Sequence, residues 1–239
     1  MKALLALLLG GAKLAKFGKL LTTGGTMLLS VFVYAAVYGW RYAVGFITLL
    51  LCHEMGHYMA ARQRGLDVGA PTFIPFVGAW IELKEQPMNA ETEAYVGMAG
   101  PLAGTVAALA CYFLARSEGS PWLLAVAYSG FSLNLFNLIP VPPLDGGRMT
   151  AVISRKVWLL GAPLLVALFF WRPSPLLILI ALLAAPQLWQ ALKGEDAMSA
   201  DYYAATPAGT RAEYALIYLG LVGFLAVMSH DVYEMLGAA

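Results

Sequence analysis

Runs of apolar residues separated by short polar breaks dominate this chain. A helix needs about 20 mostly apolar residues to cross a bilayer, and several of the runs approach or reach that length. We expect spans at residues 26–40, 42–62, 94–115, 121–139, 157–171, 175–192 and 212–228. The pattern therefore predicts an all-α polytopic membrane protein with six to seven transmembrane helices.

The segment between the second and third runs has a different pattern. Residues 65–93 contain Pro71, Pro75 and Pro87, and the stretch 72–83 between two of these prolines is rich in strand-forming residues. Non-helical backbone persists at membrane depth only where protein or a watery cavity covers it. We expect a re-entrant β-strand or hairpin here, with a surface loop as the alternative.

The composition is that of a membrane protein. Of the 239 residues, 60% are hydrophobic and 12% are charged, and the mean hydropathy is +0.71. Ordinary globular domains are about 45–50% apolar, so this composition argues against a soluble enzyme. The formal net charge is only +1. We expect the lipid bilayer around the chain and no nucleic-acid partner.

The basic residues predict an orientation. With a cytoplasmic N-terminus, the expected spans leave Arg41, Arg116 and Arg172 outside, so 12 of the 15 lysines and arginines lie inside. An excess of basic residues is typical of cytoplasmic loops. We therefore expect a multi-pass integral protein of a prokaryotic inner membrane, with its N-terminus in the cytoplasm.

One stretch inside the second expected span contains residues that could bind a metal ion and act as a general base. His53 and His57 are four residues apart, so on a helix they share one face and can reach the same metal ion. Glu54 lies beside them, where a carboxylate can act as a general base on water. Two core histidines with ordinary hydrogen bonds are the alternative, but ionisable groups at membrane depth indicate function by default.

A catalytic zinc site usually has three protein ligands and one open position, so a third ligand is needed. Asp145 follows a proline-rich break after the fourth run, and the nearest basic residue after it is Arg148. An unpaired carboxylate at this depth needs a cation, which favours Asp145. Glu82 and Glu85 are the alternative third ligands. Asp145 could instead be an ordinary turn residue, because Asp-Gly sequences favour turns.

Three further features of the sequence matter. Asn137 precedes the proline-rich break, where it could hydrogen-bond an oxyanion or, alternatively, a free carbonyl at a helix end. Gly100 and Gly104 form a small-residue face for helix packing, which we interpret as structural. Cys52 and Cys111 both lie in apolar runs, so no disulfide is expected.

The motif HEMGH at residues 53–57, together with NLIPVPPLDGG at residues 137–147, resembles the site-2 protease family of intramembrane zinc metalloproteases. The resemblance covers roughly residues 20–149. Many members of that family carry a PDZ insertion or an appended CBS domain, and this chain has room for neither.

The resemblance implies roles for individual residues. It implies that His53, His57 and Asp145 bind Zn²⁺ and that Glu54 is the catalytic base. Asn137 would help to position the substrate backbone or the oxyanion.

The resemblance also implies that residues 72–83 match the membrane-inserted strand segment of the family. An exposed strand edge there could pair with an unwound segment of the substrate. Gly100 and Pro101 would belong to the packing motif of the third span. The candidate substrate-binding residues are Phe73, Ile74, Phe76, Val77, Gly78, Ala79 and Trp80.

We thus expect three parts in the chain: an amphipathic membrane-surface segment at residues 1–24, the protease core at 25–149, and further transmembrane helices at 150–239 with a polar loop at 193–211. The expected activity is hydrolysis of peptide bonds in or near a transmembrane segment, with a single-span membrane protein as substrate. An inactive scaffold and a metal transporter are the alternatives. The oligomeric state stays open.

Overall fold

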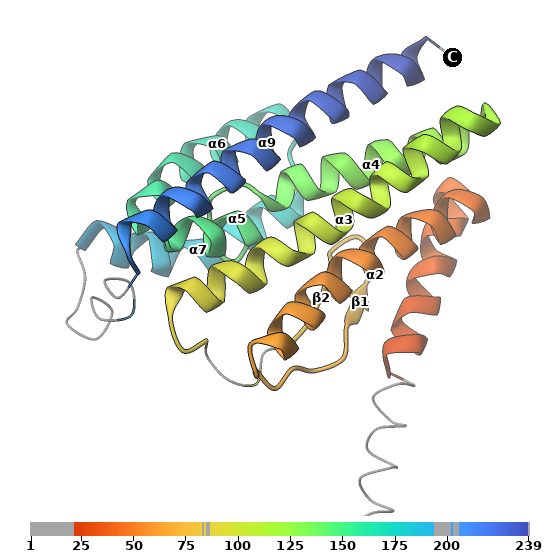
Figure 1. Ribbon diagram of the computed structural model, residues 1–239. Helices are drawn as coiled ribbons and strands as arrows, with labels where there is room; N and C mark the ends of the chain where they lie inside the picture. The colour runs from red at the N-terminus through yellow and green to blue at the C-terminus, as the bar shows by residue number, and fades with distance from the viewer. Residues whose placement is uncertain (1–21, 83, 85–86, 194–201, 203–205, 239) are drawn as a thin grey trace, which may run out of the picture.

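The computed structural model of the chain, shown in Figure 1, describes residues 22–82, 84, 87–193, 202 and 206–238. This part of the chain is mostly helical. The helices are Thr22–Tyr38, α2 (Trp40–Gln63), α3 (Ala90–Glu118), α4 (Pro121–Asn137), α5 (Asp145–Ala151), α6 (Trp158–Trp171), α7 (Pro175–Lys193) and α9 (Ala208–Gly237), with a 3₁₀ turn at Arg155–Val157. Most of the expected N-terminal surface segment and of the expected polar loop lies outside the described residues.

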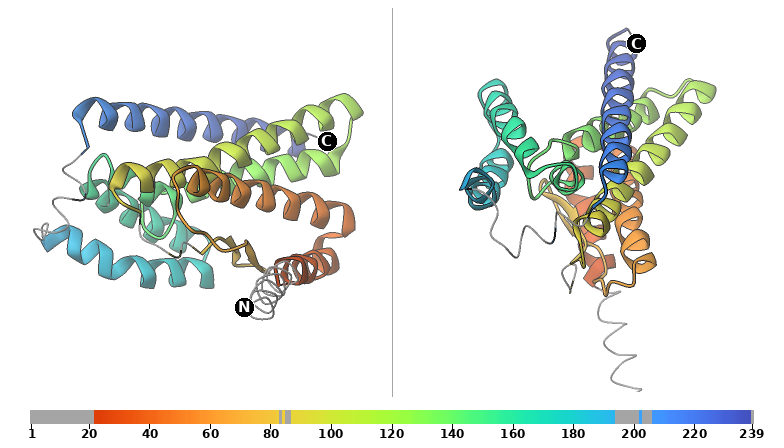
Figure 2. Two further views of the ribbon diagram at one scale, coloured as in Figure 1. Left: turned by 60° about the horizontal axis from the view of Figure 1, so that its bottom comes forward. Right: turned by 60° about the vertical axis from the view of Figure 1, so that its left-hand side comes forward.

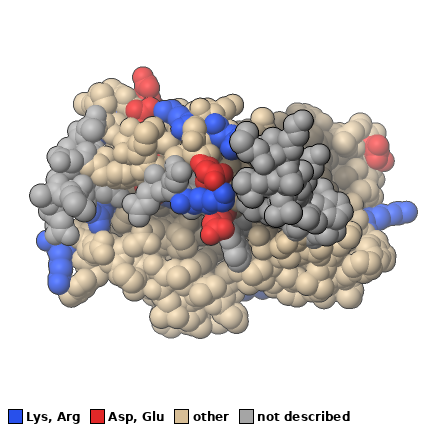
Figure 3. Space-filling model, turned by 90° about the horizontal axis from the view of Figure 1, so that it is seen from below, with Lys and Arg blue, Asp and Glu red and all other residues tan. Residues whose placement is uncertain are grey.

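Three of these helices, α3, α7 and α9, are long and apolar enough to cross a membrane. The helix Thr22–Tyr38 is apolar but shorter. In the face seen in Figure 3, charged side chains gather near the middle and most of the remaining visible surface carries none. The expectation of a mostly helical integral membrane protein is confirmed, whereas the number of six to seven spans stays a prediction.

Some helix boundaries differ from the apolar runs. Gly39 has a φ of 84°, a left-handed backbone that interrupts a helix, so Trp40 begins the second helix instead of ending the first. α4 ends at Asn137, two residues before the end of its run, because a proline-rich stretch follows. α9 extends beyond its run 212–228 at both ends, since polar residues at a helix end interrupt the apolar run without interrupting the helix.

The segment between α2 and α3 forms the expected hairpin. Strands β1 (Thr72–Ile74) and β2 (Gly78–Trp80) are antiparallel, and Phe73 lies opposite Ala79. Phe76 turns the chain between them with a φ of 61°. The hairpin lies beside α2 (Figure 1). The hairpin is confirmed, whereas its re-entrant position in the membrane stays a prediction.

Small residues allow α2, α3 and α4 to pack closely in one group. A Cβ atom added to Gly56 of α2 would collide with the carbonyl group of Ala99 in α3. One added to Gly130 of α4 would lie 2.9 Å from the Cβ atom of Ala108, also in α3. Backbones can approach this closely only where side chains are absent. Helices α2, α3 and α4 therefore form one tightly packed body.

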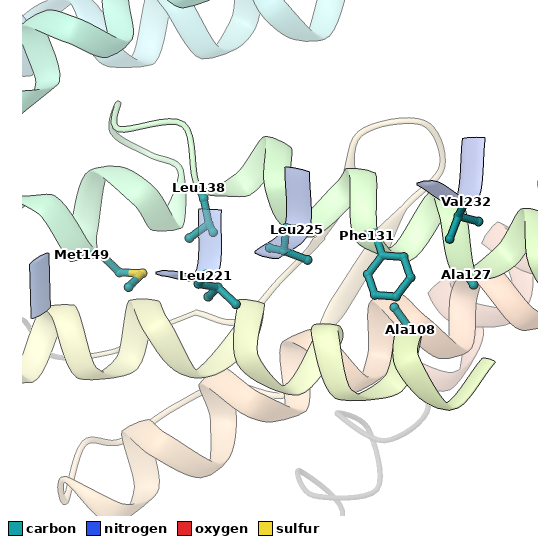
Figure 4. Packing of buried hydrophobic residues seen from close by; sticks show 8 residues of the cluster. All are labelled: Ala108, Ala127, Phe131, Leu138, Met149, Leu221, Leu225 and Val232. Carbon is teal, nitrogen blue, oxygen red and sulfur yellow. The ribbon is translucent and has the colours of Figure 1, made fainter. Parts of the chain in front are cut away.

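Helix α9 packs on α3 and α4 over much of its length, whereas α6 and α7 form a pair that stands apart from α9 (Figures 1 and 2). The largest buried apolar cluster joins α9 to α3, α4 and α5. Figure 4 shows its residues: Ala108, Ala127, Phe131, Leu138, Met149, Leu221, Leu225 and Val232. The C-terminal helix thus belongs to the same core as the segments that carry the motifs.

Candidate metal centre

The HEMGH motif lies in the C-terminal half of α2 with its polar residues buried. His53 is 2% exposed, while Glu54 and His57 are each 4% exposed. The helical spacing of four residues brings the two imidazoles together, and their Nε2 atoms are 3.1 Å apart. Both histidines therefore turn the same nitrogen toward one point.

Asp145 lies at that point, at the start of α5. Its Oδ2 atom is 3.1 Å from Nε2 of His53, and its Oδ1 atom is 3.2 Å from Nε2 of His57. The side chain is buried. The structure thus gathers His53, His57 and Asp145 into the kind of group that could hold a metal ion.

Asp145 is 92 residues beyond His53 and 88 residues beyond His57 along the chain. The ligand group is therefore assembled by the packing of α5 against α3, which itself packs on α2.

Hydrogen bonds fix which nitrogen of each histidine faces the group. Nδ2 of Asn134 donates to the carbonyl oxygen of Gly130 at 2.7 Å. The atom of Asn134 that lies 2.8 Å from Nδ1 of His53 is therefore Oδ1, which can only accept, so Nδ1 of His53 is the donor. Nδ1 of His57 donates to the carbonyl of Val96 at 2.7 Å. Both Nε2 atoms of the neutral rings therefore carry lone pairs that point at the carboxylate of Asp145.

This donor set fits zinc. Three electron-rich atoms so close together repel one another unless a proton or a metal ion lies among them. Ligand atoms about 2.0–2.2 Å from a tetrahedral zinc ion are about 3.3–3.6 Å apart. Here the two Nε2 atoms are 3.1 Å apart, and each faces a different oxygen of Asp145, His53 at 3.1 Å and His57 at 3.2 Å. Two imidazoles and one carboxylate also leave a fourth position open, as in catalytic zinc sites.

Glycines of α3 make the site possible. A Cβ atom on Gly100 would collide with the imidazole of His57, and one on Gly104 would collide with the carboxamide of Asn134. One on Gly97 would lie 2.9 Å from the Cβ atom of Arg148 in α5. Gly100 and Gly104 were expected to allow close packing of helices. They also leave room for the side chains of the centre, because α3 lies directly against those side chains.

A cavity of about 130 Å³ opens beside the three grouped side chains. Glu54, Asn137 and Arg148 line it together with Ala79 of β2 and Ile81, which follows β2. A water molecule needs only about 10–15 Å³ of such space, so the cavity has room for water and for part of a substrate. In the described part of the chain no hydrogen bond engages the Glu54 carboxylate or the Asn137 carboxamide, which leaves both for ligands in the cavity.

The predicted substrate-binding residues fall into different surroundings. Ala79 lines the cavity, and Ile74, Phe76 and Val77 are exposed near the hairpin turn. Phe73, in contrast, is 1% exposed and packs in an apolar cluster with α2, so its side chain faces the interior of the protein. Gly78 begins β2 at the turn, and the side chain of Trp80 lies outside the described part.

Sequence reasoning missed several residues of the centre. Asn134 lies three residues before Asn137, a helical spacing that could have identified it. The Val96 carbonyl gives no signal in a sequence. Arg148 lines the cavity without belonging to an expected motif, and Ile81 lines it from the expected strand segment without having been named as a site residue.

Of the two alternative ligands, the structure describes Glu82 alone and does not bring it into the group. Glu82 is exposed, and Glu85 lies outside the described residues. His230 is exposed on α9, and both cysteines are free, as expected.

Replacing Asn134 by leucine should weaken zinc binding by about 10- to 100-fold, as loss of such partners of metal-binding histidines typically does. The change leaves the Nδ1–H group of His53 buried without its acceptor. Zinc affinity measured by chelator competition checks this. Asn89→Leu is the control, because Asn89 caps α3 and its loss should lower stability while zinc affinity stays unchanged. Equal zinc affinity in Asn134→Leu and wild type would contradict the assigned role.

Comparison with known proteins gives a consistent set of matches. Residues 41–120 match the family model Peptidase family M50. Zinc metalloprotease MJ0392 of Methanocaldococcus jannaschii is 32% identical over 124 residues, which cover 48% of this chain and 36% of that protein. Putative zinc metalloprotease Rip3 of Mycobacterium tuberculosis is 33% identical over 129 residues, 48% of this chain and 32% of that protein. The matches thus span about a third of the curated relatives' own length.

Among solved structures, the chain is similar to the site-2 protease from Methanocaldococcus jannaschii. The TM-score is 0.46 and the sequence identity is 20%, over 70% of this chain and 85% of that chain.

Proposed function

We propose, from the match of residues 41–120 to peptidase family M50, that this chain is an intramembrane zinc metalloprotease. It hydrolyses peptide bonds in or near transmembrane segments of membrane proteins. The observation that carries the proposal is the group of His53, His57 and Asp145, buried beside Glu54 at a cavity that the hairpin also lines. The family resemblance expected from the sequence is confirmed.

The chain's own residues have distinct tasks in this reaction. Zinc, when bound by His53, His57 and Asp145, supplies Lewis-acid activation of water and of the scissile carbonyl. Glu54 takes the proton of the attacking water and delivers it to the nitrogen of the leaving amine. Asn137 donates its amide N–H to the oxygen of the scissile carbonyl as negative charge develops there.

The outer edge of β2 offers the substrate a backbone partner. The N–H group of Phe73 donates to Oγ1 of Thr26 at 3.3 Å, so it points away from β2. Residues directly opposite each other in an antiparallel pair either exchange both hydrogen bonds or neither. Ala79, opposite Phe73, therefore turns its N–H and C=O groups to the outer edge of β2, beside the cavity.

Peptide bonds inside a helix are already hydrogen-bonded, so a substrate helix must unwind before it is cleaved. An unwound segment that adds to β2 regains backbone hydrogen bonds. Ala79 is then the residue that holds it next to Glu54. Helix Thr22–Tyr38 supports this arrangement, since Thr26 accepts from the N–H group of Phe73 in β1 and the Tyr34 hydroxyl accepts from the N–H group of Phe76 in the turn.

Replacing Ala79 by proline should lower kcat/KM for a single-span model substrate by about tenfold, the effect of one lost hydrogen bond of about 1.4 kcal/mol. The Ala79 N–H group lies outside the β1–β2 ladder, so proline is tolerable at this edge. Ala79→Val, which keeps the N–H group, is the control. Unchanged cleavage by Ala79→Pro, with zinc content intact, would rule out strand addition at this residue.

We further place the N-terminus in the cytoplasm of a prokaryotic cell, with the chain in the inner membrane. Aromatic and basic side chains pair at two helix ends, Arg172 with Trp171 and Lys193 with Trp189, as is common at membrane interfaces. A reporter fused after Lys193 should indicate the cytoplasm and one fused after Arg172 the outside. The reverse result would overturn the orientation.

Cleavage of single-span membrane proteins by the purified protein in liposomes tests the proposed function. Products that appear with zinc-loaded wild type, and not after chelation, support it. An inactive scaffold or a metal transporter, the two alternatives, would give no product in any condition, and the comparisons lend neither of them support.

A further inference from the structure

Two helices, α6 and α9, contact the loop that carries Asp145, and both lie outside the segment that matches the family model. We define the ligand loop as residues 138–147, which comprise the connection from α4 to α5 and the first three residues of α5. It begins directly after Asn137 and includes Asp145, so its shape sets how these two residues face each other. Contacts from α6 and α9 reach this loop, and both helices lie outside residues 41–120.

The first contact comes from α9. The hydroxyl group of Tyr218 donates to the carbonyl oxygen of Leu138 at 2.7 Å. Leu138 caps the C-terminus of α4, where carbonyl groups lack helical partners. Leu138 is also 1% exposed, so Tyr218 satisfies an acceptor that is shielded from water.

The same carbonyl group contacts the other end of the ligand loop. A Cβ atom on Gly146 would collide with the carbonyl group of Leu138. The residue after Asn137 therefore lies against the residue after Asp145. Tyr218 donates its hydrogen bond at this junction.

The second contact comes from the start of α6. The indole Nε1–H group of Trp158 donates to the carbonyl oxygen of Gly147 at 2.8 Å, and Trp158 is 4% exposed. A Cβ atom on Gly161, one turn further along α6, would collide with the carbonyl of Pro140. The ligand loop is thus fixed at both of its ends by side chains of the C-terminal helices.

We propose that Tyr218 and Trp158 are positioning residues that hold the ligand loop so that Asp145 meets the two histidines. They act through the backbone and touch neither metal nor substrate. The inference rests on the proposed function, because it concerns the affinity of the zinc centre. It assigns a task to the helices that follow the family segment.

Tyr218→Phe and Trp158→Phe each test the inference by removing one hydrogen bond. Each variant should bind zinc about tenfold more weakly or worse in chelator competition, the lower end of the effect of indirect partners on metal sites. Tyr233→Phe and Trp171→Phe are the matched controls, since these side chains are 59% and 75% exposed and should leave zinc affinity unchanged.

Thermal unfolding separates positioning from a general loss of stability. A positioning role predicts that added zinc raises the melting temperature of Tyr218→Phe less than that of wild type, because stabilisation by a ligand follows its affinity. A melting temperature lowered equally with and without zinc, together with wild-type zinc affinity, would overturn the inference. Absence of zinc binding in wild type would instead refute the proposed function.

Discussion

Glu54→Gln should lower the rate of peptide hydrolysis by about 10²- to 10⁴-fold, the range that general acid–base catalysis contributes, and leave zinc bound. Glutamine keeps the size of the side chain but cannot take a proton from water. Glu54 lines the cavity and is not among the three grouped ligand side chains. The measurement is the rate of cleavage of a single-span substrate in liposomes, together with the zinc content of the same sample.

Glu118→Gln is the control for this variant. Glu118 is an exposed residue at the end of α3, so the same chemical change there should leave the rate unchanged. Full activity of Glu54→Gln would show that another group is the base. Loss of zinc from Glu54→Gln would show that Glu54 serves as a ligand.

Gly100→Ala should abolish stoichiometric zinc binding and lower stability by about 1–3 kcal/mol, the usual cost of extra methyl groups in a packed core. The added methyl group would collide with the imidazole of His57. Either the ring leaves its position or α3 moves away from α2, and both changes separate His57 from Asp145. Zinc content and thermal unfolding of the purified variant measure the two effects.

Gly220→Ala is the matched control, because no atom lies within 4 Å of a Cβ atom at Gly220 in α9. There the same change should leave zinc bound and add about 0.5–1 kcal/mol of stability through helix propensity. Gly100→Ala that retains one zinc ion and wild-type stability would contradict the close approach of α3 to the site.

The candidate metal centre could be predicted from the sequence in two ways: from the spacing of its histidines, and from the free-energy cost of an unpaired carboxylate at membrane depth. The spacing of His53 and His57 is read directly from helix geometry, and an unpaired carboxylate at membrane depth pointed to Asp145. The hairpin was predictable because prolines exclude a helix between α2 and α3. These features depend on local sequence, and each is present in the structure.

Features that depend on packing between distant segments were not predictable. Gly100 looked like a packing residue, and nothing in the sequence shows that His57 lies against it. Phe73 looked like its strand neighbours, but the side of the hairpin that faces α2 is set by tertiary contacts. The contacts of Tyr218 and Trp158 with the ligand loop likewise join segments that are far apart in the chain.

The zinc content of purified wild type, His53→Ala, Glu54→Gln and Asp145→Ala tests the central claim most directly. We expect about one zinc ion per chain in wild type and in Glu54→Gln, the number that one tetrahedral centre holds, and none in the other two variants. Full zinc in Asp145→Ala, or none in wild type, would contradict the claim that His53, His57 and Asp145 form a zinc centre.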